Sequence, residues 1–288
     1  MKVLVTGASG RLGSVVCKRL LEGGHDVLGT DQKFGKDLGV SQRVADLRDA
    51  QALYGLLEGR DAVVHLGNFP NLSAGPSPQA VLTDNTTMNV NVFRAAVDLG
   101  VRRIVFASSV QAMIRLEEGR PLEPPYGLPY FPLDGDAPAD PGYNFYGLSK
   151  ELGERVLRVL SARFPELVCT SLRFPFLAGD WFLNRIKQPL LPSALNFSEG
   201  LTHLAFADAA QLVALVLERQ QPGYHQYFPA QGLAVAGYSP AQLLAEFFAD
   251  IPLRKPAAEI TSLVDLSALE RDLDFRPSPP LTVELLRP

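Results

Sequence analysis

Two side chains near the middle of the chain could together move a proton. Tyr146 and Lys150 stand four residues apart in the run Tyr-Gly-Leu-Ser-Lys, within a stretch of helical periodicity at 144–163. That spacing is about one helical turn, so the phenol and the ammonium share one helix face. A phenol with a pKa near 10 is a poor base at neutral pH. We expect Lys150 to stabilise the phenolate, which makes Tyr146 a candidate acid and base.

A pair of serines could hold a substrate oxygen against Tyr146. Ser108 and Ser109 end an apolar, strand-like run at 103–107. Sheets of parallel strands bind ligands at the carboxyl ends of their strands, which is where these hydroxyls would lie. Successive side chains of a strand point to opposite faces, so the strand register decides which serine faces the substrate.

A glycine-rich turn lies near the start of the chain. Gly7, Gly10 and Gly13 fall in the run Thr-Gly-Ala-Ser-Gly-Arg-Leu-Gly, between a strand pattern at 2–5 and a helical pattern at 11–23. Their spacing differs from the G-x-G-x-x-G fingerprint. Gly7 suits a tight turn, Gly10 a close approach of backbone to a pyrophosphate, and Gly13 close packing of the helix. The turn predicts a dinucleotide site on the helix N-terminus. The other expected contacts in this loop are Ser9, Arg11 and Leu12.

Asp31 stands at the end of the second strand pattern, about 20 residues beyond the glycine turn. A carboxylate there can accept hydrogen bonds from ribose hydroxyls and repel a 2′-phosphate. We therefore expect NAD rather than NADP as the cofactor, although the nearby cations Arg11 and Lys33 could soften the preference.

Strand and helix patterns alternate through the first part of the chain. Strand-like runs lie at 2–5, 26–29, 62–65, 103–107 and 167–172, and helical patterns at 11–23, 49–58, 78–99 and 144–163. Continuous apolar runs are typical of strands buried on both faces of a parallel sheet. The alternation predicts an α/β fold with a doubly wound, Rossmann-like parallel sheet.

We expect residues 1–173 to form the cofactor-binding domain and residues 174–288 a small substrate-binding subdomain, with elements near 201–219 returning to the first domain. The segment 115–141 holds seven prolines, which forbid a regular helix or a central strand. Because it immediately precedes Tyr146, we interpret it as a wall or lid of the substrate site. A surface excursion without catalytic consequence is nearly as well supported.

Composition excludes several classes of function. The formal net charge is −4 and no run of Lys and Arg occurs, which argues against nucleic acid as a partner. No apolar stretch reaches the roughly 20 residues of a membrane helix, and the first strand pattern begins at Lys2, leaving no room for a signal peptide. The four histidines show no metal-ligand spacing, so we expect no metal. Cys17 and Cys169 are expected as buried thiols in a reducing compartment, the cytoplasm.

These motifs together resemble the extended short-chain dehydrogenases/reductases, the NAD-dependent epimerase/dehydratase group, over essentially the whole length. The resemblance rests on the glycine turn, Asp46-Leu47, His65-Leu66-Gly67, Asn85, Ala107-Ser108-Ser109, Tyr146 with Lys150, Arg173-Phe174-Pro175 and Phe206-Ala207-Asp208. It implies Ser109 as the hydroxyl of a catalytic triad, Tyr146 as acid and base, and Lys150 as its activator and a ribose ligand. The cofactor contacts that it implies are Asp46 and Leu47 at the adenine, Leu66 and Gly67 beside the nicotinamide, Asn85 and Phe174.

The departures from that family pattern narrow the expectation. Val110 and Gln111 replace the acidic pair with which dehydratases eliminate water, so we do not expect a dehydratase. The compact uronate dehydrogenases look similar around His-Leu-Gly, the paired serines and YGLSK, although the Asn-His that follows their serine is absent here.

Arg185 and Ser108 are further candidates for substrate contact. Arg185 could pair with a carboxylate or phosphate, or be an exposed helix arginine. Asp208 is expected to cap the helix at 207–219.

The resemblance and the candidate residues lead to one functional expectation with two alternatives. We expect an NAD-dependent oxidoreductase that acts on a hydroxyl of a sugar, uronate or related polyol through Ser109, Tyr146 and Lys150. One alternative is an NAD-dependent epimerase of sugars or nucleotide sugars, with no net redox change. The other is a non-catalytic dinucleotide sensor, which would have no need for an activated phenol.

The expected assembly is a homodimer. The helical pattern at 144–163 has a second apolar stripe, Leu148, Leu152, Val156 and Val159, and the pattern at 78–99 is apolar on more than one side. In the family that the chain resembles, these two helices commonly pair with their symmetry mates in a four-helix bundle.

Overall fold

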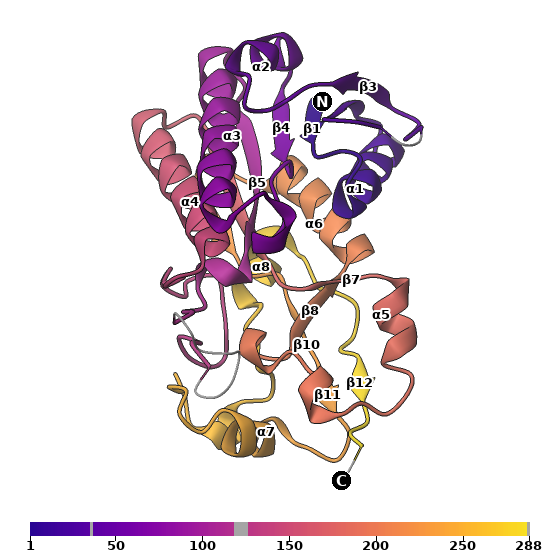
Figure 1. The fold of residues 1–288 in the computed structure, drawn as a ribbon, viewed down its shortest axis with the longest axis vertical. Coiled ribbons are helices and arrows are strands. Elements are labelled where there is room, and N and C mark those ends of the chain that lie inside the picture. The colour runs from indigo at the N-terminus through magenta and orange to yellow at the C-terminus, as the bar shows by residue number, and fades with distance from the viewer. Residues whose placement is uncertain (35–36, 118–125, 287–288) are drawn as a thin grey trace.

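The computed structural model describes residues 1–34, 37–117 and 126–286. Figure 1 shows two lobes, one above the other. The large lobe contains a seven-stranded sheet with helices on both faces, and the small lobe contains short strands and helices. Three of the prolines in the segment 115–141, at 121, 124 and 125, lie outside the described residues.

The sheet of the large lobe is parallel throughout, with strand order β3-β2-β1-β4-β5-β6-β9. Its strands are β1 (Lys2–Thr6), β2 (Asp26–Asp31), β3 (Ser41–Val44), β4 (Ala62–His65), β5 (Arg103–Ser109), β6 (Val168–Phe174) and β9 (Gly223–Tyr227). The predicted doubly wound, Rossmann-like fold is therefore confirmed. The order reverses between β1 and β4, and a crevice forms at the carboxyl ends of strands at such a switch point.

Alternating side chains of the buried strands build two cores, one on each face of the sheet. Val3 and Val5 of β1 belong to the core that α1 (Arg11–Glu22) and α6 (Phe206–Arg219) cover. Leu4, between them, belongs to the core that α2 (Ala50–Leu57), α3 (Pro78–Asp98) and α4 (Phe145–Arg163) cover. This period of two explains why β1 is apolar at three consecutive positions, Val3 to Val5: both of its faces are buried there.

Two strands of this sheet fall outside the strand-like runs expected from the sequence. β3, with the sequence Ser-Gln-Arg-Val, and β9, with Gly-Tyr-His-Gln-Tyr, form the two edges. Edge strands are only partly covered, so they lack the continuous apolar run that marks the inner strands. β9 also shows that the chain re-enters the large lobe well beyond residue 173, as α6 does by packing against α1.

The small lobe has its own apolar core. Its elements are β7 (Leu177–Ala178), α5 (Asp180–Arg185), β8 (Thr202–Ala205), β10 (Gln231–Gly232), β11 (Ala234–Val235), α7 (Pro240–Phe247) and β12 (Thr282–Val283); α8 (Ser267–Leu273) packs beneath α6. Leu128, Phe131, Leu133 and Ala137 of the proline-rich segment are buried in this core. No described residue of 115–141 lines the cavity described below, so this part of the segment is no wall of it, and the four buried residues contribute to packing of the small lobe.

Candidate active site

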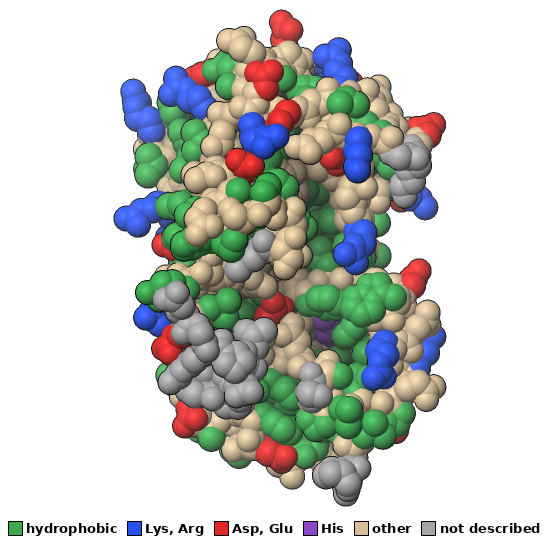
Figure 2. Space-filling view, in the orientation of Figure 1, with side chains coloured by type: hydrophobic (Ala, Val, Ile, Leu, Met, Phe, Trp, Pro, Cys, Tyr) green, Lys and Arg blue, Asp and Glu red, His purple; other side chains and the backbone are tan. Residues whose placement is uncertain are grey.

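A cavity of about 700 Å³ runs along the carboxyl edge of the sheet and into the junction with the small lobe. The space-filling view shows the hollow between the two lobes (Figure 2). Its lining comes from the turns after β1, β2, β3 and β4, the ends of β5 and β6, α4, and the small lobe. The predicted residues among this lining are Gly7, Gly10, Arg11, Leu12, Gly13, Asp31, Leu47, Leu66, Gly67, Ser108, Ser109, Tyr146, Lys150 and Phe174.

The glycine turn has room only for glycine at two of its positions. Gly7 has φ +67°, and a Cβ there would lie 2.8 Å from the carbonyl carbon of Leu66. A Cβ on Gly13 would lie 2.1 Å from the carbonyl oxygen of Gly7. The N-cap of α1, Gly10, makes no side-chain cap hydrogen bond. The turn therefore presents a bare helix N-terminus to the cavity, which suits the pyrophosphate of a dinucleotide.

Asp31 stabilises this turn and also lines the cavity. Its Oδ2 accepts a hydrogen bond from the backbone N–H of Ser9 at 2.9 Å, and its Oδ1 accepts one from the N–H of Gln32 at 2.8 Å. The hydroxyl of Ser9 donates to the carbonyl of Lys33 at 2.6 Å, and Ser9 does not line the cavity. The carboxylate thus stands where ribose hydroxyls would reach it, while the Ser9 side chain supports the loop.

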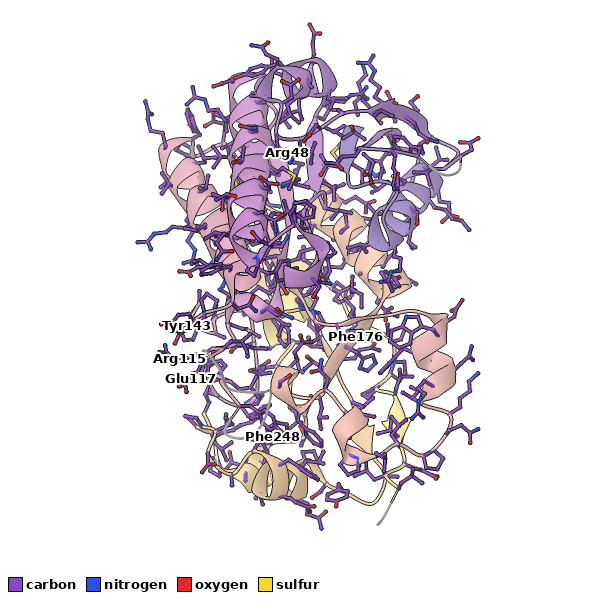
Figure 3. All side chains as sticks on the ribbon, in the orientation of Figure 1. Arg48, Arg115, Glu117, Tyr143, Phe176 and Phe248 are labelled. Atoms are coloured by element: carbon purple, nitrogen blue, oxygen red, sulfur yellow. The ribbon has the colours of Figure 1, made fainter. Side chains whose placement is uncertain are left out.

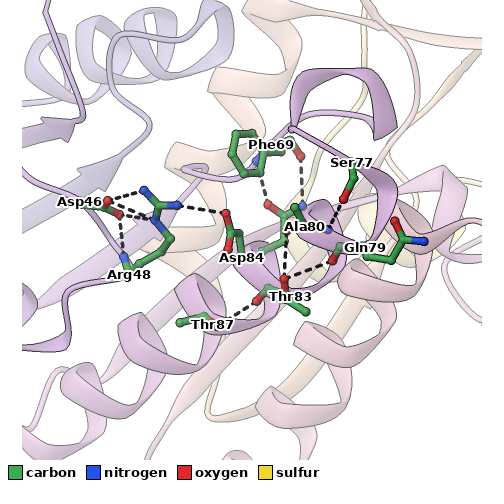
Figure 4. Close-up of polar contacts among 10 residues, drawn as sticks. Asp46, Arg48, Phe69, Ser77, Gln79, Ala80, Thr83, Asp84 and Thr87 are labelled. Atoms are coloured by element: carbon green, nitrogen blue, oxygen red, sulfur yellow. Dashed lines mark hydrogen bonds and ion pairs between the residues drawn. The ribbon is translucent and has the colours of Figure 1, made fainter.

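Arg48 forms an ion-pair bridge beside the cavity, between the loop after β3 and helix α3 (Figure 4). Its Nη2 lies 2.6 Å from Oδ2 of Asp46, and its Nη1 lies 3.1 Å from Oδ2 of Asp84. The hydrogen bond from Arg48 lowers the pKa of Asp46. Leu47 and Arg48 line the cavity whereas Asp46 does not. The sequence reasoning selected Asp46 and missed Arg48, because only the fold brings Asp84 within reach of the guanidinium.

A chain of buried hydrogen bonds joins β1 to α4 beneath the cavity. Thr6 Oγ1 accepts hydrogen bonds from the N–H groups of Leu66 and Gly67 at 3.1 and 3.0 Å, so its own proton goes to His65 Nδ1 at 2.8 Å. His65 Nε2 then donates to Asn89 Oδ1 at 2.9 Å. Asn89 in turn donates to the carbonyl of Ser149, next to Lys150.

Burial lowers the pKa of His65 to about 3, and the charge of Lys150 adds to that effect. The ring is therefore neutral at pH 7. It is a packed, hydrogen-bonded residue that positions its neighbours.

Ser109, Tyr146 and Lys150 converge at the middle of the cavity. All three side chains line the cavity, Ser109 lies close enough to lower the pKa of the Tyr146 phenol, and the ammonium of Lys150 lies 5.5 Å from the centre of the Tyr146 ring. Lys150 Nζ donates to Asn68 Oδ1 and to the carbonyl of Ala107, each at 2.8 Å. Helix α4 begins at Asn144, whose Oδ1 caps it by accepting from the N–H of Gly147.

Taken together, the protein's own groups raise the pKa of Tyr146, so Lys150 by itself does not supply the stabilisation of the phenolate. Burial raises the pKa of the phenol to about 12; the hydrogen bond from Ser109 lowers it, and the charge of Glu199 raises it. Burial also lowers the pKa of Lys150 to about 7. Since both side chains are desolvated together, the ammonium and the phenolate are each disfavoured, and a further positive charge is needed to favour the phenolate.

The register of β5 separates the two serines. Ser108 donates its hydroxyl proton to Oε1 of Glu154 at 2.6 Å, on the side of α4. Ser109 Oγ accepts from the N–H of Gln111 at 3.2 Å and reaches Tyr146. The hydroxyl of Ser108 is thus already committed within the protein, and Ser109 is the serine placed to hold a substrate oxygen.

A model of the NAD dependent epimerase/dehydratase family matches residues 3–207. The chain belongs to this family. The expected family of NAD-dependent enzymes, and NAD as its cofactor, are therefore confirmed. The geometry agrees, because the glycine turn, Asp31 and the candidate triad Ser109, Tyr146 and Lys150 line one cavity.

Individual relatives differ in their reactions. The chain is 34% identical over 218 residues to a uronate dehydrogenase from Pseudomonas putida, covering 74% of this chain and 69% of that one. It is 34% identical over 180 residues to a 2-alkyl-3-oxoalkanoate reductase from Stenotrophomonas maltophilia, covering 60% of this chain and only 50% of the reductase. A UDP-glucose 4-epimerase from Bifidobacterium longum, solved with NAD+ and UDP, superposes with a TM-score of 0.69 at 18% identity, over 96% of this chain and 94% of the epimerase. At that identity the likeness shows the fold alone.

Asn85 and Asp208 have other positions or partners than expected, and Arg185 is the exposed helix arginine of its second alternative. Asn85 is fully buried and does not line the cavity; its amide pairs with the backbone of Phe69 and with Ser149 Oγ. Arg185 is exposed at the end of α5, also away from the cavity lining. Asp208 does not cap α6, whose N-cap is Ala205; its carboxylate accepts two hydrogen bonds from Ser278 and ties down the C-terminal segment.

The described residues contain no cluster of three or more His, Cys, Asp or Glu side chains that could hold a metal ion. Within the same part of the chain, no helix has both the length and the apolar character needed to cross a membrane.

Proposed function

We propose that the chain is an NAD-dependent oxidoreductase that acts on a hydroxyl group of a sugar, uronate or related polyol. The observation that carries this proposal is the convergence of Ser109, Tyr146 and Lys150 at a cavity whose far end is the glycine turn. The uronate dehydrogenase relative supports the same class of reaction. Bound NAD would supply the hydride acceptor and a positive nicotinamide ring.

The protein residues divide the remaining work. Ser109 would donate a hydrogen bond to the substrate oxygen and hold it against Tyr146. Tyr146 would then remove the proton from the substrate hydroxyl as general base. Lys150, held by Asn68 and the Ala107 carbonyl, would orient and stabilise the phenolate. The network from Thr6 through His65 and Asn89 would keep the neighbouring turn of α4 in place.

A substrate panel tests the proposal. Neutral sugars, uronates and nucleotide sugars are incubated with the protein and NAD, and NADH is followed by its absorbance at 340 nm. Steady NADH formation that is lost in Tyr146→Phe supports the dehydrogenase. Conversion of one sugar isomer into another without net NADH would identify an epimerase, which could use the same three side chains. NAD binding with neither reaction would favour a sensor.

We also propose that the protein is cytoplasmic and forms a homodimer through α3 and α4. Cys17 and Cys169 are buried free thiols, which suits a reducing compartment. Val90 on α3 and Val159 on α4 are 41% and 65% exposed, as expected for apolar residues that a second copy of the chain would cover.

A further inference from the structure

A buried carboxyl group from the small lobe faces the catalytic side chains. Glu199 ends a single turn of 3₁₀ helix, η4 (Phe197–Glu199), and lines the cavity. The chain then reverses at Gly200, in the left-handed conformation with φ +67°. Thr202 donates its hydroxyl proton to the carbonyl of Glu199 at 2.6 Å. The turn at Gly200 and the hydrogen bond from Thr202 therefore hold the backbone of Glu199 in place.

Two amide groups hold the carboxylate oxygens. Asn196 Nδ2 donates to Oε2 of Glu199 at 2.8 Å, and Gln111 Nε2 donates to Oε1 at 3.3 Å. Gln111 is itself oriented, because its Oε1 accepts from Asn144 Nδ2 at 2.7 Å and its N–H donates to Ser109 Oγ. A continuous set of hydrogen bonds thus connects Glu199 to the catalytic serine.

Glu199 acts electrostatically on the catalytic phenol. Burial raises the pKa of Glu199, and its hydrogen bonds to Asn196 and Gln111 oppose part of that rise. Both carboxyl oxygens accept hydrogen bonds from these amides, as the oxygens of a carboxylate do. The negative charge in turn raises the pKa of Tyr146. Because this coupling passes through a desolvated space, a charge on a substrate bound in the same space would also interact with Glu199.

The substrate half of the cavity offers no cation to balance that carboxylate. We define this half as the lining contributed by Ser108, Ser109, Val110, Gln111, Tyr146, Phe174, Pro175, Phe176, Leu177, Glu199 and Phe206. Within the described lining, the basic residues are Arg11, Arg48 and Lys150. Arg11 and Arg48 lie at the glycine turn and beyond β3, and Lys150 is directed to Asn68 and Ala107.

Arginines elsewhere near the small lobe are directed away from this half. Arg115, whose position at the outer edge is labelled in Figure 3, pairs with Asp140, and Arg254 pairs with Asp134. Phe176, labelled in the same view near the junction of the lobes, contributes an apolar wall.

We infer that the substrate is an uncharged hydroxyl compound, a neutral sugar or polyol, and that Glu199 selects it by accepting a substrate hydroxyl and repelling carboxylates and phosphates. The inference rests on the proposed function and narrows it. A hydroxyl can satisfy a buried acceptor, whereas a second negative charge beside it is repelled, and no side chain defined as part of this half supplies a compensating cation. Uronates, sugar phosphates and nucleotide sugars would all be poor substrates for this physical reason.

Matched pairs of probes test the inference. D-galactose and D-galacturonate differ only in a hydroxymethyl group against a carboxylate, as do D-glucose and D-glucuronate. Binding is measured by calorimetry on Tyr146→Phe loaded with NAD, where no turnover intervenes, and kcat/KM is measured on the otherwise unmodified enzyme. In at least one pair, we expect the neutral sugar to bind at least about tenfold more tightly than its uronate, or to have a kcat/KM at least about tenfold higher.

Variants at Glu199 separate charge from shape. Glu199→Gln keeps the size of the side chain and removes its charge. The ratio of neutral sugar to uronate, in affinity or in kcat/KM, should therefore fall about tenfold, mainly because the uronate binds and reacts better. Glu199→Asp keeps the charge and should retain the preference. The kcat/KM ratios of the unmodified enzyme require no variant, so they test the inference even if a substitution disturbs folding.

The outcomes distinguish the inference from the function on which it rests. Uronates that bind or react as well as their neutral partners would overturn the inference while leaving an oxidoreductase in place. If folded Glu199→Gln kept the same ratio of neutral sugar to uronate as the unmodified enzyme, the inference would likewise be overturned while the oxidoreductase remained in place. If neither pair binds and none of these sugars reduces NAD, the inference and the sugar or polyol substrate class both fail.

Discussion

Arg173 and Glu154 form a two-point ion pair beneath the catalytic serines. Arg173 Nε lies 2.9 Å from Glu154 Oε1 and Nη2 lies 2.8 Å from Oε2, with the two side chains only 1% and 3% exposed. Ser108 donates to the same Oε1. The pair thus joins β6 to α4 and engages the hydroxyl of Ser108, which leaves Ser109 as the serine available to the substrate.

Removing one member of this pair should strongly destabilise the fold. Glu154→Gln leaves the guanidinium of Arg173 buried without its counter-charge, and we expect a loss of about 3–5 kcal/mol in the free energy of unfolding. Guanidinium titration followed by circular dichroism measures it. Glu22→Gln is the matched control, because the pair Lys18–Glu22 is exposed and 3.9 Å apart, and such pairs contribute about 0–1 kcal/mol. Equal losses in the two variants would contradict a stabilising role for the buried pair.

Tyr146→Phe should lower turnover by at least about a hundredfold on a confirmed substrate, because it removes the acid and base while preserving the ring. NAD affinity, measured by calorimetry, should survive. Lys150→Met should reduce both turnover and affinity, since Lys150 is expected to bind the ribose as well. Near-normal turnover in Tyr146→Phe would show that another residue carries the proton.

Asp31 should set the cofactor preference. NAD should bind more tightly than NADP, and Asp31→Ala should narrow the gap because the carboxylate no longer repels a 2′-phosphate. The substitution also removes the acceptor for the N–H of Ser9, so NAD itself should bind more weakly. Asp31→Asn keeps an oxygen acceptor without the charge and serves as the matched variant. Calorimetry that finds equal affinities for NAD and NADP in the unmodified protein would refute the assignment.

Acid should destabilise the protein through His65. Its pKa is about 3 in the folded chain and about 6.5 when unfolded, so below pH 6.5 the unfolded state binds a proton that the native state does not. The contribution of the neutral His65 ring to the free energy of unfolding is fully present above pH 6.5, and it decreases as the pH drops towards 3. Between pH 7.5 and 5.0 the stability advantage over His65→Gln should shrink by about 2 kcal/mol. If the free energies of unfolding of the two proteins changed with pH by the same amount across this range, the ring of His65 would titrate normally in the native state.

Light scattering tests the proposed homodimer. The monomer has a mass of 31.3 kDa, and we expect twice that value at micromolar concentration. Leu152→Glu on α4 should lower the mass without loss of helical signal, because a charge would enter the interface. Leu21→Glu, at an apolar residue on α1 that is 45% exposed, is the control and should leave the mass unchanged. A single-chain mass in the unmodified protein rejects the dimer.

Much of the nucleotide half could be predicted from the sequence because its signals are local. The glycine turn spans eight consecutive residues, and the strand and helix patterns on either side of it place it. Tyr146 and Lys150 lie on one helical turn, so their proximity follows from helix geometry alone. The inner strands are rich in Val, Leu and Ile because both faces are covered, and this pattern, alternating with helical periodicity, was sufficient to predict a parallel, doubly wound sheet.

The tertiary structure decided whatever depends on contacts between distant segments. Ser108 and Ser109 became distinguishable only through the register of β5 against α4, where Glu154 accepts from Ser108. Gln111 and Glu199 are 88 positions apart, and nothing local to either marks them as partners. Periodicity reports which face of an element is buried but not which distant side chain lies against it. For that reason the sequence determined the fold and the catalytic pair, and the packing of the small lobe determined the charge of the substrate half.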